Sequence, residues 1–303
     1  MSKTGTLTFN ALYSVNGAAF QSYTLGTTIT LANEGDCVSF KADGTNTTFG
    51  DGGSNYMKFT LTGLLEMSGS LGYLIDSNNG SGFNYGNWSG GGTLFNGQQA
   101  LIGNADLSWL NSTTSTMSQN FMNSFLRGTN VSKVRICVAK TNSSRESQFN
   151  HFAQDCRSLV YADLSSIQTA QSSKNAFSEA FRGCYSLEEL DLSNLTTANG
   201  ASALSNLARS ASRLKVVKLN KLSSVTGANG MDNAFNGCTS LELVDFSEAT
   251  AVPTLSNVNA FTSTNSTYKI VVPDALYLTW IGTANWSDST IVDHIVKASE
   301  YTA

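Results

Sequence analysis

One stretch of the sequence indicates the fold most clearly: Phe181-Arg-Gly-Cys-Tyr-Ser-Leu-Glu-Glu-Leu-Asp-Leu-Ser-Asn-Leu195. An aromatic residue comes first, then Gly183 and Cys184, then leucines three and two residues apart. Successive side chains of a β-strand point to opposite faces, so Leu190 and Leu192 would share one face while Glu189 and Asp191 occupy the other. The stretch therefore predicts a short strand with one apolar and one charged face.

The same pattern recurs along the chain. Phe235-Asn-Gly-Cys-Thr-Ser-Leu241 leads into Val244-Asp-Phe-Ser247, and Cys156-Arg-Ser-Leu159 leads into Asp163-Leu-Ser165. Equivalent apolar strand positions follow one another at intervals of 29, 28, 28, 27, 27 and 26 residues: Leu107, Ile136, Leu164, Leu192, Leu219, Phe246 and Val272. A period of about 20–29 residues with a Leu-x-x-Leu-x-Leu core is typical of leucine-rich repeats, which stack into a solenoid.

We therefore predict an α+β solenoid in which about seven leucine-rich repeats occupy residues 95–272. Residues 1–80 alternate apolar and polar side chains between turn residues, which predicts an all-β domain, a small sandwich. This domain could cap the solenoid core or anchor the protein to a larger assembly. Residues 81–94 are expected to form a glycine-rich linker, and residues 273–303 a C-terminal cap with a helix that begins near Asp274.

Each repeat also carries two apolar residues three or four positions apart before its strand, such as Phe177 and Phe181. That spacing places both side chains on one face of a short helix or helical turn. Each repeat is thus predicted to contain a helical turn, a loop at the Cys position and a strand. The phenylalanines are expected to stack in the core, because no repeat can bury its apolar face alone.

The five cysteines are explained by the repeat. Cys156, Cys184 and Cys238 occupy one repeat position, where a small buried residue is needed. Disulfides or a metal site are the rival interpretations. The chain has no Cys-x-x-Cys pair, and His151 and His294 stand at no metal-ligand spacing. We expect the three thiols to be buried and structural.

Composition excludes several classes of function. The net charge of −4 and the pI near 5.2 argue against binding to nucleic acid. The sequence contains no run of about 18 apolar residues, so we expect no membrane span. The first residues lack the apolar region of a signal peptide, so we expect either that no such peptide directs secretion or that one has been removed. Gly80, Gly82 and Gly86 lack the lysine of a phosphate loop. With two histidines and no nucleophile–base pattern, we expect no catalytic site, no cofactor and no bound metal ion.

The charged faces of the predicted strands are the candidate binding surface. If the strands stack in register, two outward rows result: Asp106, Arg135, Asp163, Asp191, Lys218, Asp245 and Val271 in one, and Lys133, Tyr161, Glu189, Val216, Leu243 and Lys269 in the other. The residues expected at the centre of a protein or glycan site are Tyr161, Asp163, Glu189, Asp191, Lys218 and Asp245. The rival interpretation is a solvated face that keeps the sheet soluble. Asp163 beside Asp191 is a like-charge pair that destabilises a sheet, unless Lys218, water, a cation such as calcium or a partner compensates it.

The repeat resembles a known family. Phe-x-Gly-Cys-x-Ser-Leu-x-x-Leu-Asp-Leu-Ser at 181–193, nearly repeated at 235–247, is similar to the BspA-like leucine-rich repeat. The N-terminal stretch around Gly35-Asp-Cys-Val-Ser-Phe40 and the tail around Val272-Pro-Asp-Ala275 resemble segments that accompany such arrays in gut bacteria and their phages. The resemblance implies surface display and adhesion, either as a bacterial adhesin or as a fibre or decoration protein of a virion.

Without a signal peptide, lipobox or sorting tail in the sequence, we expect a phage virion surface protein that is not an enzyme. Its residues 1–80 would attach to other virion proteins, and its repeats would contact a host surface protein or glycan. Self-association into a homo-oligomer is compatible with this expectation. The alternatives are a bacterial cell-surface adhesin that has lost its leader, and a cementing protein whose repeats bind other virion subunits.

Overall fold

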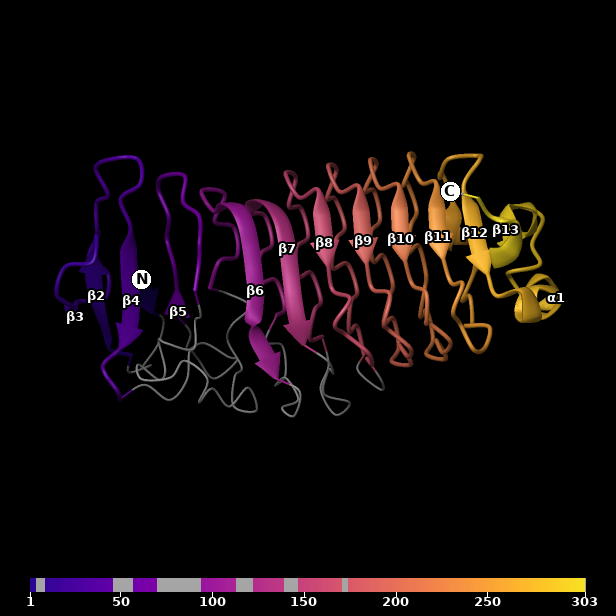
Figure 1. Cartoon of the computed structure of the whole chain (residues 1–303), viewed down its shortest axis with the longest axis horizontal. Coiled ribbons are helices and arrows are strands. Elements are labelled where there is room, and N and C mark those ends of the chain that lie inside the picture. Colours follow the sequence, from indigo (N-terminus) through magenta and orange to yellow (C-terminus); the bar gives the residue numbers. More distant parts are fainter. Residues whose placement is uncertain are drawn as a thin grey trace.

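A computed structural model describes residues 1–3, 9–45, 57–69, 94–112, 122–138, 147–170 and 174–302. The chain forms an elongated parallel β-solenoid of about six turns, with two small antiparallel sheets near its N-terminus (Figure 1). Eight strands form one sheet in the order β13-β12-β11-β10-β9-β8-β7-β6. They are β6 (Ile102–Ser112), β7 (Asn130–Val138), β8 (Tyr161–Asp163), β9 (Glu189–Asp191), β10 (Val216–Lys218), β11 (Leu243–Asp245), β12 (Lys269–Val272) and β13 (Ile295–Lys297).

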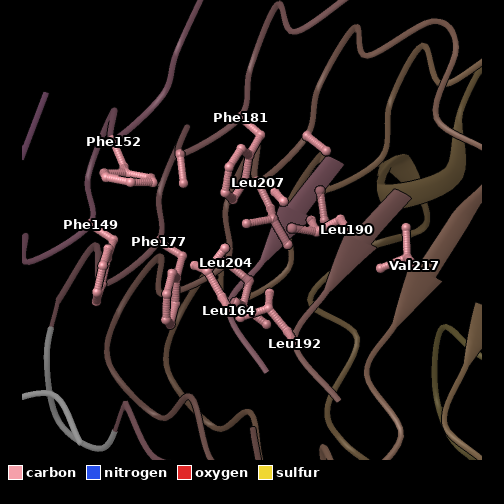
Figure 2. Packing of buried hydrophobic residues seen from close by; sticks show 14 of the residues in the cluster. Phe149, Phe152, Leu164, Phe177, Phe181, Leu190, Leu192, Leu204, Leu207 and Val217 are labelled. Atoms are coloured by element: carbon pink, nitrogen blue, oxygen red, sulfur yellow. The ribbon is translucent and has the colours of Figure 1, made fainter. Parts of the chain in front are cut away.

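The predicted strand register is confirmed. Leu107 pairs with Ile136, Ala162 with Leu190, and Leu190 with Val217 in successive parallel strands. The side chains of two inward rows are at most 1% exposed because each coil covers its neighbour: Ala105, Val134, Ala162, Leu190, Val217, Val244 and Ile270 in one row, and Leu107, Ile136, Leu164, Leu192, Leu219, Phe246 and Val272 in the other. Figure 2 shows Leu190, Leu192 and Val217 packed inside the coils.

The predicted helical turn before each strand is wrong. The segments that hold the paired phenylalanines contain no helix between β7 and β11 among the described residues. Instead, alternate N–H groups bond within the coil and to the next coil. Phe152 N donates to Phe149 O (3.1 Å), whereas Phe149 N and Ala153 N donate to Ala176 O and Ala180 O of the following coil (both 2.8 Å). We call each such segment a turn ribbon.

Residues with positive φ recur at every fourth position of the turn ribbons. In the coil before β8 they are Ser147, His151 and Asp155, with φ of 58°, 53° and 59°. A left-handed residue interrupts a right-handed helix, so the ribbon cannot become one. The phenylalanines still face the core as predicted. Phe149 and Phe177 stack across two coils with ring centroids 5.2 Å apart and planes 10° apart (Figure 2).

The N-terminal segment contains two small antiparallel sheets in place of the predicted sandwich, as far as the described residues show. One sheet has the order β3-β2-β4 and the other pairs β1 with β5. Their strands are β1 (Ser2–Lys3), β2 (Ala11–Val15), β3 (Gln21–Tyr23), β4 (Val38–Ala42) and β5 (Met57–Lys58). After β5, the segment 59–67 contributes one isolated parallel bridge, between Leu65 and Leu101.

One apolar core joins this segment to the solenoid. Phe59 stacks on Phe95 with centroids 5.0 Å apart, and Phe95 contacts Phe125 of the next coil edge to face. Leu65 N donates to Ala100 O (2.9 Å), so the chain before the solenoid lies along its first coil. Buried residues of this segment, such as Phe9 and Tyr23, therefore belong to the same apolar cluster as the solenoid core. The predicted linker at 81–94 lies outside the described residues except for Leu94.

The C-terminal segment both continues the sheet and packs on its end. η4 (Val258–Phe261) precedes β12, and the helix predicted near Asp274 is confirmed as η5 (Asp274–Leu276) followed by α1 (Tyr277–Gly282). β13 then pairs in parallel with β12, flanked by η6 (Val292–His294) and η7 (Ala298–Glu300). Trp280 and Trp286 are fully buried against Phe246. Figure 1 shows α1 at the end of the solenoid.

Candidate functional site

The outward face of the parallel sheet brings the predicted site residues together. We call this surface the charged face. Asp163 pairs with Asp191, Asp191 with Lys218, and Lys218 with Asp245 in successive strands. Tyr161 pairs with Glu189 in the neighbouring row. The side chains of all six predicted residues lie half-buried on this face: Tyr161, Asp163, Glu189, Asp191, Lys218 and Asp245.

Each aspartate in the row of Asp163, Asp191 and Asp245 also binds the backbone just after its strand, a role that was not predicted from the sequence. Asp163 Oδ1 accepts hydrogen bonds from the backbone N and the hydroxyl of Ser165 (3.0 and 2.6 Å). Asp191 and Asp245 accept bonds from the backbone N of the serine two residues later (2.9 and 2.8 Å). These are Asx turns, which end a strand by satisfying its next N–H group. The repeated Asp-x-Ser signal was present in the sequence.

Lysine and arginine compensate the carboxylates of this face. The ammonium of Lys218 forms an ion pair with Glu189 and lies 3.7 Å from Asp191 Oδ2. Arg135 Nε lies 3.5 Å from Asp163 Oδ2. Arg135 beside Asp163 and Lys218 beside Asp191 therefore relieve the repulsion between the two aspartates. Lys218 was one of the groups predicted to do so. The hydrogen bond from Lys218 to Glu189 raises the pKa of the Lys218 ammonium, against the effect of burial.

The ends of the row differ from its centre. Val271, which pairs with Asp245 and was predicted to face outward, is buried at 4% exposure. Hydrogen bonds from Ser108 hold the pKa of Asp106 below its usual value, and Arg135 adds to the effect. At the other end Asn220 Nδ2 donates to Asp245 Oδ2 (2.6 Å) in place of a cation. Burial raises the pKa of the Tyr161 hydroxyl, and the nearby Asp163 adds to this shift. Tyr161 therefore stays neutral and can donate a hydrogen bond at physiological pH.

The charged face does not form a metal site within the described residues. No three His, Cys, Asp or Glu side chains of that part of the chain gather closely enough to hold an ion. The two histidines lie elsewhere: His151 Nε2 is 3.6 Å from Glu179 on a turn ribbon, and His294 contacts Tyr268 near β12. What the charged face offers chemically is a ladder of ion pairs and hydrogen-bond donors at strand spacing, about 4.8 Å.

The cysteines at the repeat position are buried, as predicted. Each thiol donates to a carbonyl oxygen of the preceding coil: Cys156 to Leu126 (2.8 Å), Cys184 to Ala153 and Cys238 to Ala208. Burial raises the pKa of Cys156 to about 11 and that of Cys238 to about 12. Thiols that stay protonated are poor nucleophiles, so these cysteines serve the stacking of coils.

Two further expectations meet the structure only in part. No helix in the described ranges is long and apolar enough to cross a membrane. Gly80, Gly82 and Gly86 lie outside the described residues.

Comparison of the chain with protein-family models, curated proteins and solved structures found no match. The resemblance to BspA-like repeats therefore still rests on the sequence segments quoted for it alone.

Proposed function

We propose that this protein is a non-enzymatic binding protein of a phage virion surface, with a BspA-like leucine-rich repeat array whose charged face recognises a protein or glycan partner. The observation that carries the proposal is the register of the sheet, in which Asp163, Asp191 and Lys218 lie side by side on one outward face. Solenoids use such extended surfaces for recognition because neighbouring coils repeat the same geometry.

The ion pairs of the charged face favour recognition through charge and hydrogen bonding. Lys218 is held between Glu189 and Asp191, so its position is fixed before a partner arrives. Preorganised groups lose less side-chain entropy on binding than free ones. Beside them lie the half-buried apolar side chains of Val216 and Leu243, which continue the row of Tyr161 and Glu189. A charged cluster next to a modest apolar strip suits a protein or glycan surface.

Binding is tested with labelled protein and intact host cells of the source community. Asp191→Asn together with Lys218→Gln removes both charges, and the amide oxygen of the new asparagine can replace the carboxylate oxygen that accepts from Ser193 N. We expect this variant to lose binding at least about tenfold, which is about 1.4 kcal/mol. Lys297→Ala with Glu300→Ala deletes another exposed ion pair of 2.7 Å and serves as the matched control. Equal binding by both variants and the parent would refute recognition by the charged face.

Location is tested by mass spectrometry of purified phage particles and of bacterial envelope fractions. Peptides of this chain in particles would support a virion protein. Peptides confined to the envelope, together with a longer precursor, would support the adhesin alternative. A virion protein that binds other particle proteins but no cells would instead be a cementing protein.

A further inference from the structure

Charge alternates from coil to coil on the charged face. β9, β10 and β11 lie side by side in the sheet (Figure 1). Their coils share three equivalent positions, just before the strand, at its last residue and three residues later: Glu188, Asp191 and Asn194 in the coil of β9, Lys215, Lys218 and Lys221 in that of β10, and Glu242, Asp245 and Glu248 in that of β11. All cations of this set therefore belong to the middle coil, and all carboxylates to its two neighbours.

Two of the three lysines form their ion pairs toward β9 only. Lys215 Nζ lies 3.2 Å from Glu188 Oε2, and Lys218 Nζ lies 3.7 Å from Asp191 Oδ2. Neither lysine forms an ion pair with the coil of β11 among the described residues. The side chains of Lys215 and Lys218 are 46% and 38% exposed, so they remain accessible to a partner.

The carboxylates of the β11 coil are consequently left without a close cation. Glu242 is exposed and forms no ion pair within the part of the chain that the structure describes. Asp245 accepts hydrogen bonds from neutral groups, an amide and a backbone N. Glu248 is 61% exposed, and the ammonium of Lys221 lies as far as 3.9 Å from it. A partner with cations at the same spacing would complement this coil.

A second copy of the chain carries cations at that spacing. We consider a rotation of one copy by 180° about an axis that is parallel to the strands and passes between β10 and β11, above the charged face. β10 of each copy then lies over β11 of the other, and every residue keeps its position along the strand. Lys218 of each copy therefore faces Asp245 of the other, and the half-buried Val216 faces Leu243. A two-fold axis makes each contact twice.

The same rotation matches the positions on either side of the strands. Lys215 of one copy meets Glu242 of the other where the chain enters the strands. Lys221 meets Glu248 where the chain leaves them. Opposite charges thus face each other at all three positions of the two coils, which is the complementarity that steers and orients specific association.

The next coils agree with this axis and disagree with others. Glu189 would face Lys269, a half-buried lysine that forms no ion pair of its own among the described residues. An axis between β9 and β10 would instead place Asp163 over Asp245. An axis along the length of the solenoid would place the lysine coil over itself. Like charges that face each other oppose association, so one arrangement is favoured.

We propose that the charged face binds a second copy of this chain, in a two-fold dimer with β10 of each copy over β11 of the other. This inference rests on the proposed function, because it names the partner of the same face. Six strands at about 4.8 Å, each about 20 Å long with its flanking residues, offer on the order of 600 Å² per copy, which is at the low end for specific interfaces. The dimer is therefore weak and reversible.

The test is analytical ultracentrifugation of the full chain over a range of concentrations. We expect a monomer–dimer equilibrium with a dissociation constant of about 10–100 μM at low ionic strength. Because exposed ion pairs are screened by salt, the dimer should weaken at least about tenfold between roughly 50 and 500 mM salt. A parent chain that remains monomeric at about 300 μM and low salt overturns the proposal.

Charge exchange identifies the surface. Lys215→Glu with Lys221→Glu is one variant, and Glu242→Lys with Glu248→Lys is the other. Each variant alone brings like charges together and should dimerise at least about tenfold more weakly than the parent. An equimolar mixture restores opposite charges at every one of these contacts and should form a mixed dimer about as tight as that of the parent. A mixture that associates no better than the separate variants contradicts the proposed arrangement.

A control variant and the cell-binding assay separate this proposal from the proposed function. Lys41→Glu with Arg209→Glu makes the same change in net charge at sites off the charged face, and it should dimerise like the parent. A monomeric parent whose binding to cells is lost with Asp191→Asn and Lys218→Gln would overturn the dimer and leave the host partner standing. A parent that dimerises but binds no cells would support the second copy and remove the host partner.

Discussion

The thiol of Cys184 donates a hydrogen bond of 3.0 Å to the carbonyl oxygen of Ala153, a residue of the preceding coil. The same carbonyl also accepts from the backbone N of Cys156 (3.1 Å). Cys156 and Cys238 repeat this relationship with Leu126 and Ala208. Three coils are therefore each linked to the preceding coil by a buried thiol, and Ala211 occupies the same position in another coil without a thiol.

The first prediction concerns thiol reactivity. Cys37 is exposed and Cys137 half-buried, whereas Cys156, Cys184 and Cys238 are buried. Because only the thiolate reacts, and burial raises the pKa of Cys156 to about 11, an aromatic disulfide reagent at pH 8 should label Cys37 quickly, Cys137 more slowly and the three buried cysteines only after unfolding. Absorbance of the released thiol measures each phase. Cys37→Ser should remove the fast phase alone, and rapid labelling of a third thiol would contradict burial.

The second prediction concerns the stack of phenylalanines. Phe177 is fully buried and stacks on Phe149 at 5.2 Å. Phe177→Ala should lower the free energy of unfolding by about 3–5 kcal/mol, because it removes the ring and leaves a cavity. Urea unfolding followed by circular dichroism measures the change. Phe20→Ala is the control, since Phe20 is 43% exposed, and a loss there as large as at Phe177 would refute the packing argument.

The third prediction concerns pH. Burial lowers the pKa of His151 below 6.5, although Glu179 opposes the shift. The unfolded chain then takes up this proton first as the pH falls below 6.5, so stability is lost from there down through the folded pKa. His151→Asn removes this loss, and asparagine tolerates the positive φ at this position, as Asn206 does in a later coil. The free energy of unfolding of the variant, relative to that of the parent, should therefore increase as the pH falls from 7.5 to 5.

Urea unfolding of parent and His151→Asn at both pH values measures this difference. Ser124→Asn is the matched control. Ser124 occupies the position that His151 and Glu179 occupy in the next two coils, has φ of 57° and carries no titratable group. Its difference from the parent should not change with pH. If the two variants show the same pH dependence, His151 is not the source.

The fourth prediction concerns coil deletion. Leu190 pairs with Val217, so removal of residues 190–216 joins Glu189 to Val217 in register. The shortened chain should keep its β-sheet spectrum and unfold cooperatively, with one coil interface fewer. Small-angle scattering should show a particle shorter by about 4.8 Å, one strand spacing. Deletion of residues 190–202 removes half a coil and should abolish folding, and a folded product would argue against the repeat.

The register of the solenoid could be predicted because inward residues such as Leu190 and Val217 mark each coil. The turn ribbons could not, because a repeat of four residues between Phe177 and Phe181 fits a helix equally well. What separates the two structures is the left-handed residue at every fourth place, as at Ser202, Asn206 and Ser210. Serine and asparagine are common in loops of many kinds, so this signal is hard to read in one sequence.

The charged face was predicted residue by residue, whereas its contacts were not. The pairing of Lys218 with Glu189 depends on which way a long side chain leans across two coils. The ring contact between Tyr268 and His294 at the C-terminal end could not be predicted for another reason. Tyr268 and His294 meet only because β13 adds a further strand to the sheet, in a segment that lacks the leucine pattern.

The backbone bonds between coils, such as Phe177 N to Ala203 O (2.8 Å), join neighbouring layers along the long axis of the molecule. A force applied between the two ends would load these bonds in tension, one layer after another, rather than shear many at once. Each coil released would extend into about 90 Å of chain, from 27 residues at 3.3–3.6 Å each. If the protein is anchored at one end and pulled at the other, it would therefore unfold coil by coil. It would lengthen in steps under load rather than unfold in a single event.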